Sequence, residues 1–399
     1  MTLFWIGCGL TSIGMHCHAM ALAIQAAAAR KRIPLEILAP RTVNARTAAA
    51  LDLRLVLARS VYETNPGGFA RRNDFEADVA GRRNALHKDL TRVLAHRPTS
   101  GDIVVLTTPL APELAALADW YERLPAGNRP TLAAYCVLPI GHGIADDGSW
   151  QRGAVRSLYR DALQRLFALT EGRFQLFCEN RQVLDDLSPL APNAHLHPHI
   201  FERPPETQPR GRPGIPYALV IGSVWASRRG KGTDLVLEML RTDAARRTPF
   251  DWIVQVAPLH RRRPDGCDGD NMHFILNVPD HAEYWNHLAG ASLVLLPYDP
   301  VAYGDGRGSG VFEEAKAIGT PVLCSAAPFF VDGLSQLGAE SLIFRPYSAA
   351  ALFDKAVEVM ATIDRHRDRF QECAQRAGHG ADGFINRLLS VQNGGQEPA

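Results

Sequence analysis

The chain has 399 residues, enough for two or three domains with sizeable hydrophobic cores. Its 43 Lys and Arg residues against 42 Asp and Glu leave a formal net charge of +1, which argues against a protein that holds nucleic acid through bulk charge. Seven cysteines, odd in number and irregularly spaced, do not form a disulfide framework and fit a reducing compartment.

The N-terminal stretch bears on where the protein is found. No basic residue precedes Arg30, and glycines and His16 break the early apolar run, so the stretch does not resemble a signal peptide. No uninterrupted apolar run in the sequence is long enough to cross a bilayer. We therefore expect a cytoplasmic protein.

Strand-like and helix-like segments alternate along the first half of the chain, which predicts a mostly parallel sheet with helices on both faces. Strands are expected at Thr2–Cys8, Pro34–Ala39, Asp102–Thr108, Thr131–Leu138, Phe174–Cys178 and His195–His199. Helices are expected at Met15–Lys31, Ala77–Ala95, Glu113–Arg123, Gly153–Leu169 and Arg181–Leu187, and the region from Val43 to Pro98 is helix-rich. These elements predict one doubly wound, Rossmann-like domain.

A proline-rich stretch at Glu202–Pro216 interrupts this pattern and is expected to be a linker, because five prolines in fifteen residues cannot continue a helix or a central strand. The alternation then restarts. Strands are expected at Tyr217–Gly222, Asp251–Ala257, His273–Val278, Ser292–Tyr298, Pro321–Ser325 and Ser341–Arg345. Helices are expected at Thr233–Arg241, His281–Ala289, Ser309–Ile318, Asp332–Leu337 and Ala349–Ile363.

The predicted organisation is therefore α/β, with two Rossmann-like, doubly wound domains in series. The first domain spans residues 1–203, a linker follows at 204–216, the second domain spans 217–363, and a helical tail occupies 364–399. Two such domains are expected to face a central cleft, because ligands of open α/β sheets bind beyond the carboxyl ends of the strands.

The most informative stretch runs from Ser292 to Ser325. A buried strand leads into a loop with three glycines, and the loop opens onto a helix with its N-cap expected at Ser309 and its end at Gly319. Unpaired N–H groups and the positive end of the helix dipole make such a helix start a favourable phosphate site.

A second loop, Gly222–Gly232, follows the first strand of the second domain and carries cations beside glycines. Arg228 and Lys231 at such a strand-to-helix turn suit a diphosphate, because each cation offsets charge that grows on a leaving phosphate. A solvated basic turn is the alternative interpretation.

The run from Ser309 to Val322 resembles the nucleotide-sugar signature of GT-B glycosyltransferases of the GT4 type (family 4, group 1), in which a glutamate precedes Ala-x-x-x-Gly-x-Pro. That glutamate is Glu314 here, and the resemblance implies that it holds the ribose hydroxyls of the donor nucleotide. The family carries another acidic residue eight positions earlier, where this sequence has Gly306, and Asp305 is its nearest substitute.

The same resemblance extends to the second loop. The family holds the donor diphosphate with an Arg-x-x-Lys-Gly pattern, which Arg228, Lys231 and Gly232 match. Ser223 stands where many members carry an arginine. The resemblance thus covers the motifs of the second domain, and the first domain only in its architecture. It also implies that the helical tail at 364–399 crosses back to the first domain.

Two adjacent glutamates need separate interpretations. Glu313 is expected to pair with Lys316 three residues later, as an ordinary surface residue does. Glu314 has no local cation and shares a helix face with Gly310, on the side of the predicted phosphate loop, so ligand contact is expected for it. Arg307 and Ser309 also have structural explanations, as a loop arginine and a helix cap.

In the first domain, His142 directly follows a predicted strand. Family members often carry a histidine that faces the reacting sugar in this part of the chain, so the resemblance implies a catalytic role, with a solvated loop histidine as the alternative. Asp146 and Asp147 are further candidates. Gly9 and Gly14 match the family's first glycine-containing loop.

The sequence gives only weak evidence for metal binding or membrane binding. His16 and His18 beside Cys17 form a short cluster without a distant partner pair. Asp268-Gly-Asp270 has the Asp-x-Asp form of some metal-dependent glycosyltransferases, but a turn amid arginines is the expected structure. Four arginines, at Arg71–Arg72 and Arg82–Arg83, offer a feeble basic patch among acidic neighbours, so at most weak peripheral membrane association is expected.

Taken together, these residues predict a hexosyltransferase-like glycosyltransferase, as in polysaccharide or glycoconjugate biosynthesis. The expected donor is a nucleoside diphosphate-sugar, and the expected acceptor is a saccharide, a lipid-linked saccharide or another molecule. The resemblance implies that the configuration at the transferred carbon is retained. No cofactor, metal or nucleic acid is expected. The predicted donor-binding residues are Gly9, Ser223, Gly232, Asp305, Arg307, Gly308, Ser309, Gly310, Val311 and Glu314, and the predicted catalytic residues are His142, Arg228 and Lys231. A nucleotide-sugar epimerase of GT-B fold and a non-catalytic sugar-nucleotide binding protein are the alternatives.

Overall fold

The chain folds into two compact units. The computed structural model describes residues 1–11, 16–63, 72–95, 97–140, 149–202, 211–212, 214–222, 230–256, 262–304, 307–376 and 380–392. The first unit comprises Met1–Glu202 and His379–Ala399, and the second comprises Arg203–Gly378. Each unit has its own parallel sheet.

The sheet of the first unit has seven strands among the described residues, in the order β3-β2-β1-β4-β5-β6-β7. All its neighbouring strands are parallel. The strands are β1 (Leu3–Gly7), β2 (Leu35–Pro40), β3 (Leu53–Leu57), β4 (Ile103–Thr107), β5 (Thr131–Cys136), β6 (Phe174–Cys178) and β7 (Ala194–Leu196). The order reverses direction between β1 and β4, which is where an open α/β sheet offers a binding crevice.

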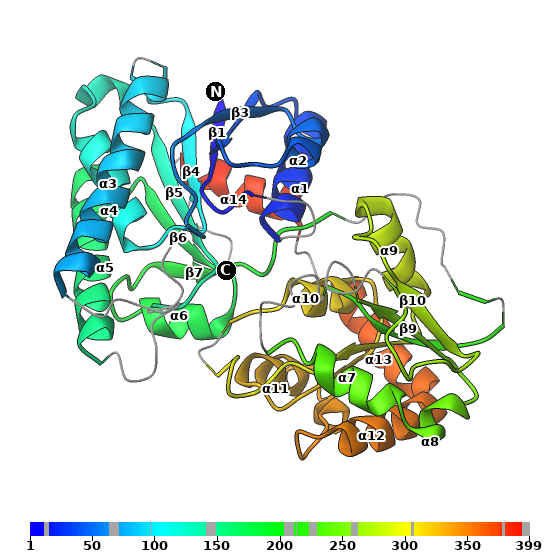
Figure 1. Cartoon of the computed structure of the whole chain (residues 1–399). Helices are drawn as coiled ribbons and strands as arrows, with labels where there is room; N and C mark the ends of the chain where they lie inside the picture. Colours follow the sequence, from blue (N-terminus) through cyan, green and yellow to red (C-terminus); the bar gives the residue numbers. More distant parts are fainter. Residues whose placement is uncertain are drawn as a thin grey trace. The chain divides into compact units, whose positions relative to one another are not determined.

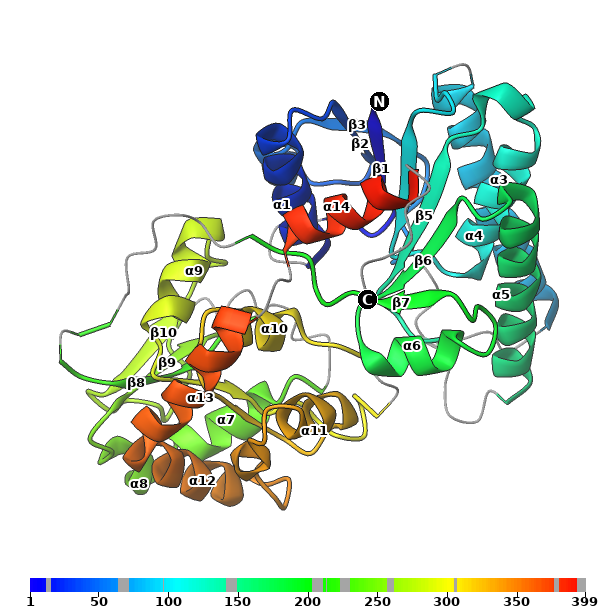
Figure 2. The same ribbon diagram turned by 180° about the vertical axis from the view of Figure 1, so that it is seen from behind.

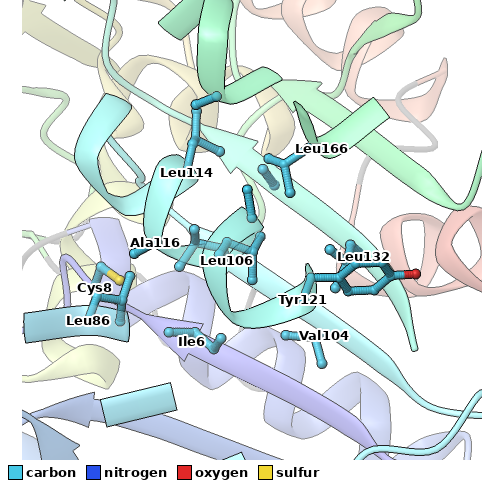
Figure 3. Close-up of a cluster of buried hydrophobic side chains, with 14 of the residues drawn as sticks. Ile6, Cys8, Leu86, Val104, Leu106, Leu114, Ala116, Tyr121, Leu132 and Leu166 are labelled. Carbon is cyan, nitrogen blue, oxygen red and sulfur yellow. The ribbon is translucent and has the colours of Figure 1, made fainter. Parts of the chain in front are cut away.

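Helices cover both faces of this sheet (Figures 1 and 2). They are α1 (His16–Arg30), α2 (Ala45–Ala50), α3 (Arg72–Leu94), α4 (Ala111–Glu122), α5 (Ser149–Thr170), α6 (Arg181–Leu187) and α14 (Ala381–Gln392). Alternate residues of β1 face opposite sides: Phe4 and Ile6 pack with α3, α4 and α5, whereas Leu3 and Trp5 pack with α1 and α14. Figure 3 shows part of the first of these cores, where Ile6 and Val104 lie below Leu106 and Leu114.

The C-terminal helix α14 belongs to the first unit, although the second unit precedes it in the chain. Its Phe384 is fully buried and makes edge-to-face contacts with Trp5, Tyr135, Phe177 and His197, at ring-centroid separations of 4.9 to 6.0 Å. The helical tail expected at 364–399 is thus divided, because α13 (Ile363–Arg376) lies in the second unit and packs against α10 (Gly310–Ala317).

The second unit has five parallel strands among its described residues, in the order β10-β9-β8-β11-β12. They are β8 (Tyr217–Val220), β9 (Asp251–Gln255), β10 (Met272–Ile275), β11 (Leu293–Leu296) and β12 (Val322–Cys324). The remaining helices are α7 (Thr233–Leu240), α8 (Asp243–Arg246), α9 (His281–Gly290), α11 (Pro328–Ser335) and α12 (Ala349–Ala361). Here the strand order reverses between β8 and β11.

One strand was missed by the sequence analysis and one expected strand was wrong. The region from 43 to 98 is helix-rich as predicted, with α2 and α3, but it also contains β3, an edge strand whose Arg54 and 39 % exposed Leu55 do not give the buried pattern of a central strand. The strand expected at 341–345 is instead a 3₁₀ turn at Glu340–Leu342 followed by one bridge, between Ile343 and Cys324. No helix within the described ranges is both long and apolar enough to cross a membrane.

Candidate functional site

The two loops that carry the predicted phosphate site lie against each other at the point where the second sheet reverses direction. Asp299, just after β11, donates its backbone N–H to the carbonyl of Gly230 over 2.7 Å. Gly222, at φ 79°, approaches Val311 of α10 so closely that an added Cβ would lie 2.6 Å from its Cγ2. The loops after β8 and β11 therefore form one surface, beyond the carboxyl ends of neighbouring strands.

Gly232 is the tightest point of this surface. It is the N-cap of α7 in the left-handed conformation, at φ 74°. A Cβ on this residue would lie 1.8 Å from the carbonyl oxygen of Pro297, which belongs to the loop after β11. Only glycine fits both the backbone conformation and the contact, so Gly232 allows the two loops to approach.

Helix α10 begins and ends where its sequence predicts. Ser309, only 4 % exposed, is the N-cap, and its hydroxyl accepts the N–H of Phe312 at 3.4 Å. Gly319 follows the helix at φ 77°, and Thr320 donates its N–H back to the carbonyl of Ala315 at 2.9 Å. The helix N-terminus, with its partial positive charge, thus opens from the glycine-rich loop.

Lys231 is connected to that helix start through Tyr298. Its Nζ lies 2.7 Å from the Tyr298 hydroxyl and 3.9 Å from the centre of the same ring. The Tyr298 hydroxyl in turn lies 3.2 Å from the Ser309 Oγ. Burial, followed by the nearby Tyr303 phenol, raises the pKa of Tyr298, so it meets the ammonium as a neutral hydroxyl. A cation and a helix dipole therefore converge on one small region.

Glu314 lies in the same helix and is only 6 % exposed. Its Oε2 accepts a hydrogen bond from the hydroxyl of Tyr284 in α9, a protein partner that the sequence did not reveal. The adjacent Glu313 pairs instead with Lys316 at 2.5 Å, as its spacing predicts. The pairing predicted for Glu313 is therefore confirmed, and the ligand contact predicted for Glu314 stays a prediction.

The other predicted donor-binding residues of the described chain have packing contacts. Arg307 lies 4.8 Å above the ring of Tyr303 and donates to the carbonyl of Ala302, while Val311 packs on Gly222. Gly308 precedes the Ser309 cap and Gly310 is the first residue of α10. Several other predicted residues lie outside the part of the chain that the structure describes: Ser223, Arg228, Asp305, His142, Asp146, Asp147 and Gly14.

A cluster of polar side chains lies at the direction change of the first sheet, just beyond β1 and β4. Cys17 Sγ lies 3.3 Å from His16 Nε2 and 3.4 Å from Thr108 Oγ1, and the Tyr62 hydroxyl lies 3.4 Å from the same His16 nitrogen. Thr108 has φ 54°, a conformation that a β-branched residue rarely adopts and that tends to occur at functional sites.

Gly9 packs beneath this cluster. A Cβ on Gly9 would lie 2.8 Å from Cys17 Sγ and 3.1 Å from the Tyr62 ring, so its missing side chain makes room for these two residues. This packing role accounts for Gly9 without the donor contact predicted for it. Burial raises the pKa of the Cys17 thiol to about 11, so the thiol is neutral at ordinary pH and is a poor nucleophile there.

A buried pair completes the first-unit cluster. His199 Nδ1 lies 2.7 Å from Oε1 of Glu179, and the two residues are 1 % and 8 % exposed. The His199 ring lies edge-to-face with the ring of His16, at a centroid separation of 6.1 Å. A carboxylate that accepts from Nδ1 fixes the imidazole tautomer and orientation. The cluster therefore combines imidazole, carboxylate, thiol and hydroxyl side chains.

Several of the residues considered for metal or membrane binding make ion pairs within the protein. Asp268, of the Asp-x-Asp form, pairs with Arg246 at 3.0 Å, and no group of three or more potential ligands in the described part of the chain is arranged to hold a metal. Arg82 binds Glu113 through contacts of 2.7 to 3.0 Å in the interior, so it cannot belong to the basic surface patch considered for membrane binding. Arg83 binds Asp119 in the same two-pronged way.

Comparisons with known proteins identify the architecture. No protein-family model and no curated protein sequence matches the chain. Solved structures do, and one is the calicheamicin glycosyltransferase CalG4, with a TM-score of 0.61 and 16 % identity over 98 % of both chains. The fold is GT-B.

Other similar solved structures include a second glycosyltransferase and a protein assigned as an epimerase. The glycosyltransferase VinC, in complex with dTDP, has a TM-score of 0.55 and 12 % identity over 99 % of this chain and 100 % of VinC. A protein from Listeria monocytogenes that is assigned as a UDP-N-acetylglucosamine 2-epimerase has a TM-score of 0.53 and 12 % identity over 98 % and 96 % of the two chains. At such identities the likeness concerns the GT-B fold alone, so function must be argued from the site.

In this GT-B chain, the residues that sequence reasoning missed come from elements distant in sequence. Tyr284 and Glu314 are 30 residues apart, and Glu179 and His199 are 20 apart. Tyr298 had a partial signal in the sequence, because the strand expected at Ser292–Tyr298 leads into the predicted phosphate loop. No short spacing marks the other pairs, since they meet only when the sheets form.

Proposed function

We propose that the protein is a glycosyltransferase that moves a sugar from a nucleoside diphosphate donor to a hydroxyl of an acceptor. The observation that carries the proposal is that Lys231 and the Ser309 cap meet at the start of α10, with the buried Glu314 more than one turn further along the same helix. A cation and a helix N-terminus suit a diphosphate, and a carboxylate suits the hydroxyls of a ribose. The GT4-like signature supports the same division of roles.

In the proposed reaction, the bond between the sugar C1 and the diphosphate breaks and a new C1–O bond forms to the acceptor. Negative charge grows on the leaving diphosphate, and the Lys231 ammonium with the α10 N-terminus stabilises it more in the transition state than in the bound donor. Arg228 is proposed to assist from the same loop. Glu314 binds a part of the donor that does not change during the reaction.

The acceptor is proposed to be a saccharide, lipid-linked or free, with its hydroxyl received by the polar cluster of the first unit. His16 is partly exposed there, whereas His199 and Glu179 are buried behind it. Imidazole and hydroxyl groups suit the binding of a sugar hydroxyl. The family resemblance favours retention of configuration, in which the leaving phosphate takes the acceptor proton. The imidazoles of the cluster favour inversion, in which His16 takes it.

Two variants test the assignment of the donor site. Glu314→Ala removes a contact that is equal in the ground and transition states, so the donor KM should rise while kcat changes little. Lys231→Ala removes a contact that strengthens as charge develops, so kcat should fall by about 10²–10³. Glu313→Ala is the matched control, because its carboxylate pairs with Lys316 and should affect neither constant. Wild-type kinetics in both site variants would refute the assignment.

The stereochemical outcome requires a separate measurement. The anomeric configuration of the first product formed can be followed by proton NMR, starting from a donor of known configuration. An unchanged configuration supports the GT4-like, retaining reaction, and a reversed one supports a proton acceptor in the first-unit cluster.

An epimerase is the second candidate function, because the GT-B fold is shared with the Listeria protein assigned as a nucleotide-sugar 2-epimerase. Incubation with donor alone separates the candidates: an epimerase converts the donor sugar without an acceptor, whereas a transferase forms a glycoside only when a mixed acceptor pool is added. Donor binding with neither product would identify a non-catalytic sugar-nucleotide binding protein.

A further inference from the structure

We propose that Tyr284 is a positioning residue that fixes the Glu314 carboxylate for recognition of the nucleoside end of the donor. This inference rests on the proposed function of the α10 site and adds a residue that lies outside both predicted motifs. The hydroxyl of Tyr284 donates to Oε2 of Glu314, across from α9 to α10.

The bond matters because Glu314 is almost fully buried, at 6 % exposure. A carboxylate withdrawn from water needs hydrogen-bond donors, and one donor on one oxygen also restricts the rotation of the carboxyl group. Burial, and then the charge of Glu314, raise the pKa of Tyr284 well above its usual range, so the phenol keeps its proton and remains a donor throughout the physiological pH range.

Helix α9 does not depend on this hydroxyl for its own position. Its Trp285 and Leu288 are 1 % and 0 % exposed, and Asp280 caps it by accepting the N–H of Glu283 at 2.9 Å. The hydroxyl of Tyr217, in β8, also donates to the carbonyl of His287 in α9 at 2.6 Å. The Tyr284 hydroxyl is therefore directed at Glu314, while other contacts hold the helix.

The ligand chemistry follows from the position of Glu314 in α10. The cation and the helix start, where phosphate is expected, lie at the Ser309 end, and Glu314 lies more than one turn further along the helix. A carboxylate has several acceptor sites, so Glu314 can accept from the Tyr284 phenol and also suit a hydroxyl-bearing group such as a ribose. Tyr284 should therefore influence binding of the nucleoside part and not of the phosphates.

The test uses the full-length protein and isothermal titration with UDP, GDP, ADP and dTDP, followed by inorganic pyrophosphate. Loss of one hydrogen bond in Tyr284→Phe should weaken the best-bound nucleotide about three- to tenfold and leave pyrophosphate affinity within about twofold. In a double-mutant cycle, Tyr284→Phe should cost little once Glu314→Ala is present, because the hydroxyl acts through the carboxylate. Circular dichroism and thermal melts confirm that each variant is folded.

Tyr217→Phe is the matched control, since it removes a hydroxyl that holds α9 without touching Glu314, and it should alter neither affinity. The inference is overturned if Tyr217→Phe reproduces the loss, if pyrophosphate weakens equally, or if the two substitutions add. A wild-type protein that binds nucleotides, with Tyr284→Phe unchanged, overturns the inference alone. A wild-type protein that binds none of these nucleotides overturns the proposed function and the inference together.

Discussion

Substitution of Gly232 by alanine offers the sharpest test of how the proposed donor surface is built. Two effects add at this position. The left-handed backbone at φ 74° costs an L-residue about 1–2 kcal/mol. The new Cβ would also lie 1.8 Å from the carbonyl oxygen of Pro297, which is backbone and cannot rotate away, so one loop must move. Overpacking of this kind typically costs about 1–3 kcal/mol more.

The total expected loss is thus about 2–5 kcal/mol, together with separation of the two loops. Gly266→Ala is a matched control in the same unit, because Gly266 has φ 78° but its nearest neighbour is the flexible side chain of Arg241, 3.4 Å from the new Cβ. It should lose only the backbone part, about 1–2 kcal/mol. For a unit of this size each kcal/mol lowers Tm by about 2–4 °C.

Calorimetry and nucleotide titration on the two variants provide the measurement. Gly232→Ala should melt at a clearly lower temperature than Gly266→Ala and should lose nucleotide affinity, whereas Gly266→Ala should bind as the wild type does. Equal stability losses, or full nucleotide affinity in Gly232→Ala, would show that contact between the two loops is not what forms the binding surface.

Three further outcomes are expected. Tyr298→Phe keeps the ring under Lys231 but removes the hydroxyl between the ammonium and the helix cap, so steady-state kcat should fall by less than in Lys231→Ala, and an unchanged kcat would contradict this. Burial raises the pKa of Cys17 from 9.0 to about 11, so the folded protein keeps the thiol protonated at a higher pH than the unfolded chain does. The free energy of unfolding should therefore be unaffected by this thiol below pH 9 and should fall by about 3 kcal/mol as the pH rises from 9 through 11. Urea titrations should show that Cys17→Ala removes this pH-dependent loss. Arg82→Ala should lower the free energy of unfolding by about 3–5 kcal/mol, because it leaves Glu113 charged and buried. Adding Glu113→Ala to this variant should lower it by much less than another 3–5 kcal/mol, since the unpaired charge is then gone. Additive losses from the two substitutions would argue against the pair.

The sequence predicts those parts of the fold that local signals control. Ser309 and Gly319 bound α10 because a cap hydroxyl and a left-handed glycine act within one helix turn. The two glycine-containing loops of the second unit were identified separately, and parallel pairing of β8 with β11 brings them together. A doubly wound pattern therefore predicts that these two loops meet, without any knowledge of their contacts.

Contacts made by tertiary packing escape such reasoning. Glu314 has no cation three or four residues away in its own helix, which favours a ligand contact, yet a phenol from α9 already reaches it. Arg82 was grouped with Arg83 as surface charge because they are neighbours in sequence, whereas Glu113 takes Arg82 into the interior. The strand expected at 341–345 has suitable residues, but only Ile343 pairs with β12. Sequence spacing does not encode these distances.

The return of α14 to the first unit makes the second unit, in effect, an insertion within the first. During synthesis the seven strands of the first sheet emerge from the ribosome long before Phe384, which fills the space between Trp5, Tyr135 and Phe177. Until then one face of that sheet lacks part of its cover and exposes apolar surface to other nascent chains. The first unit therefore matures last, after the second has had time to fold, and a ribosome-stalled chain ending before α14 should be the species that chaperones bind.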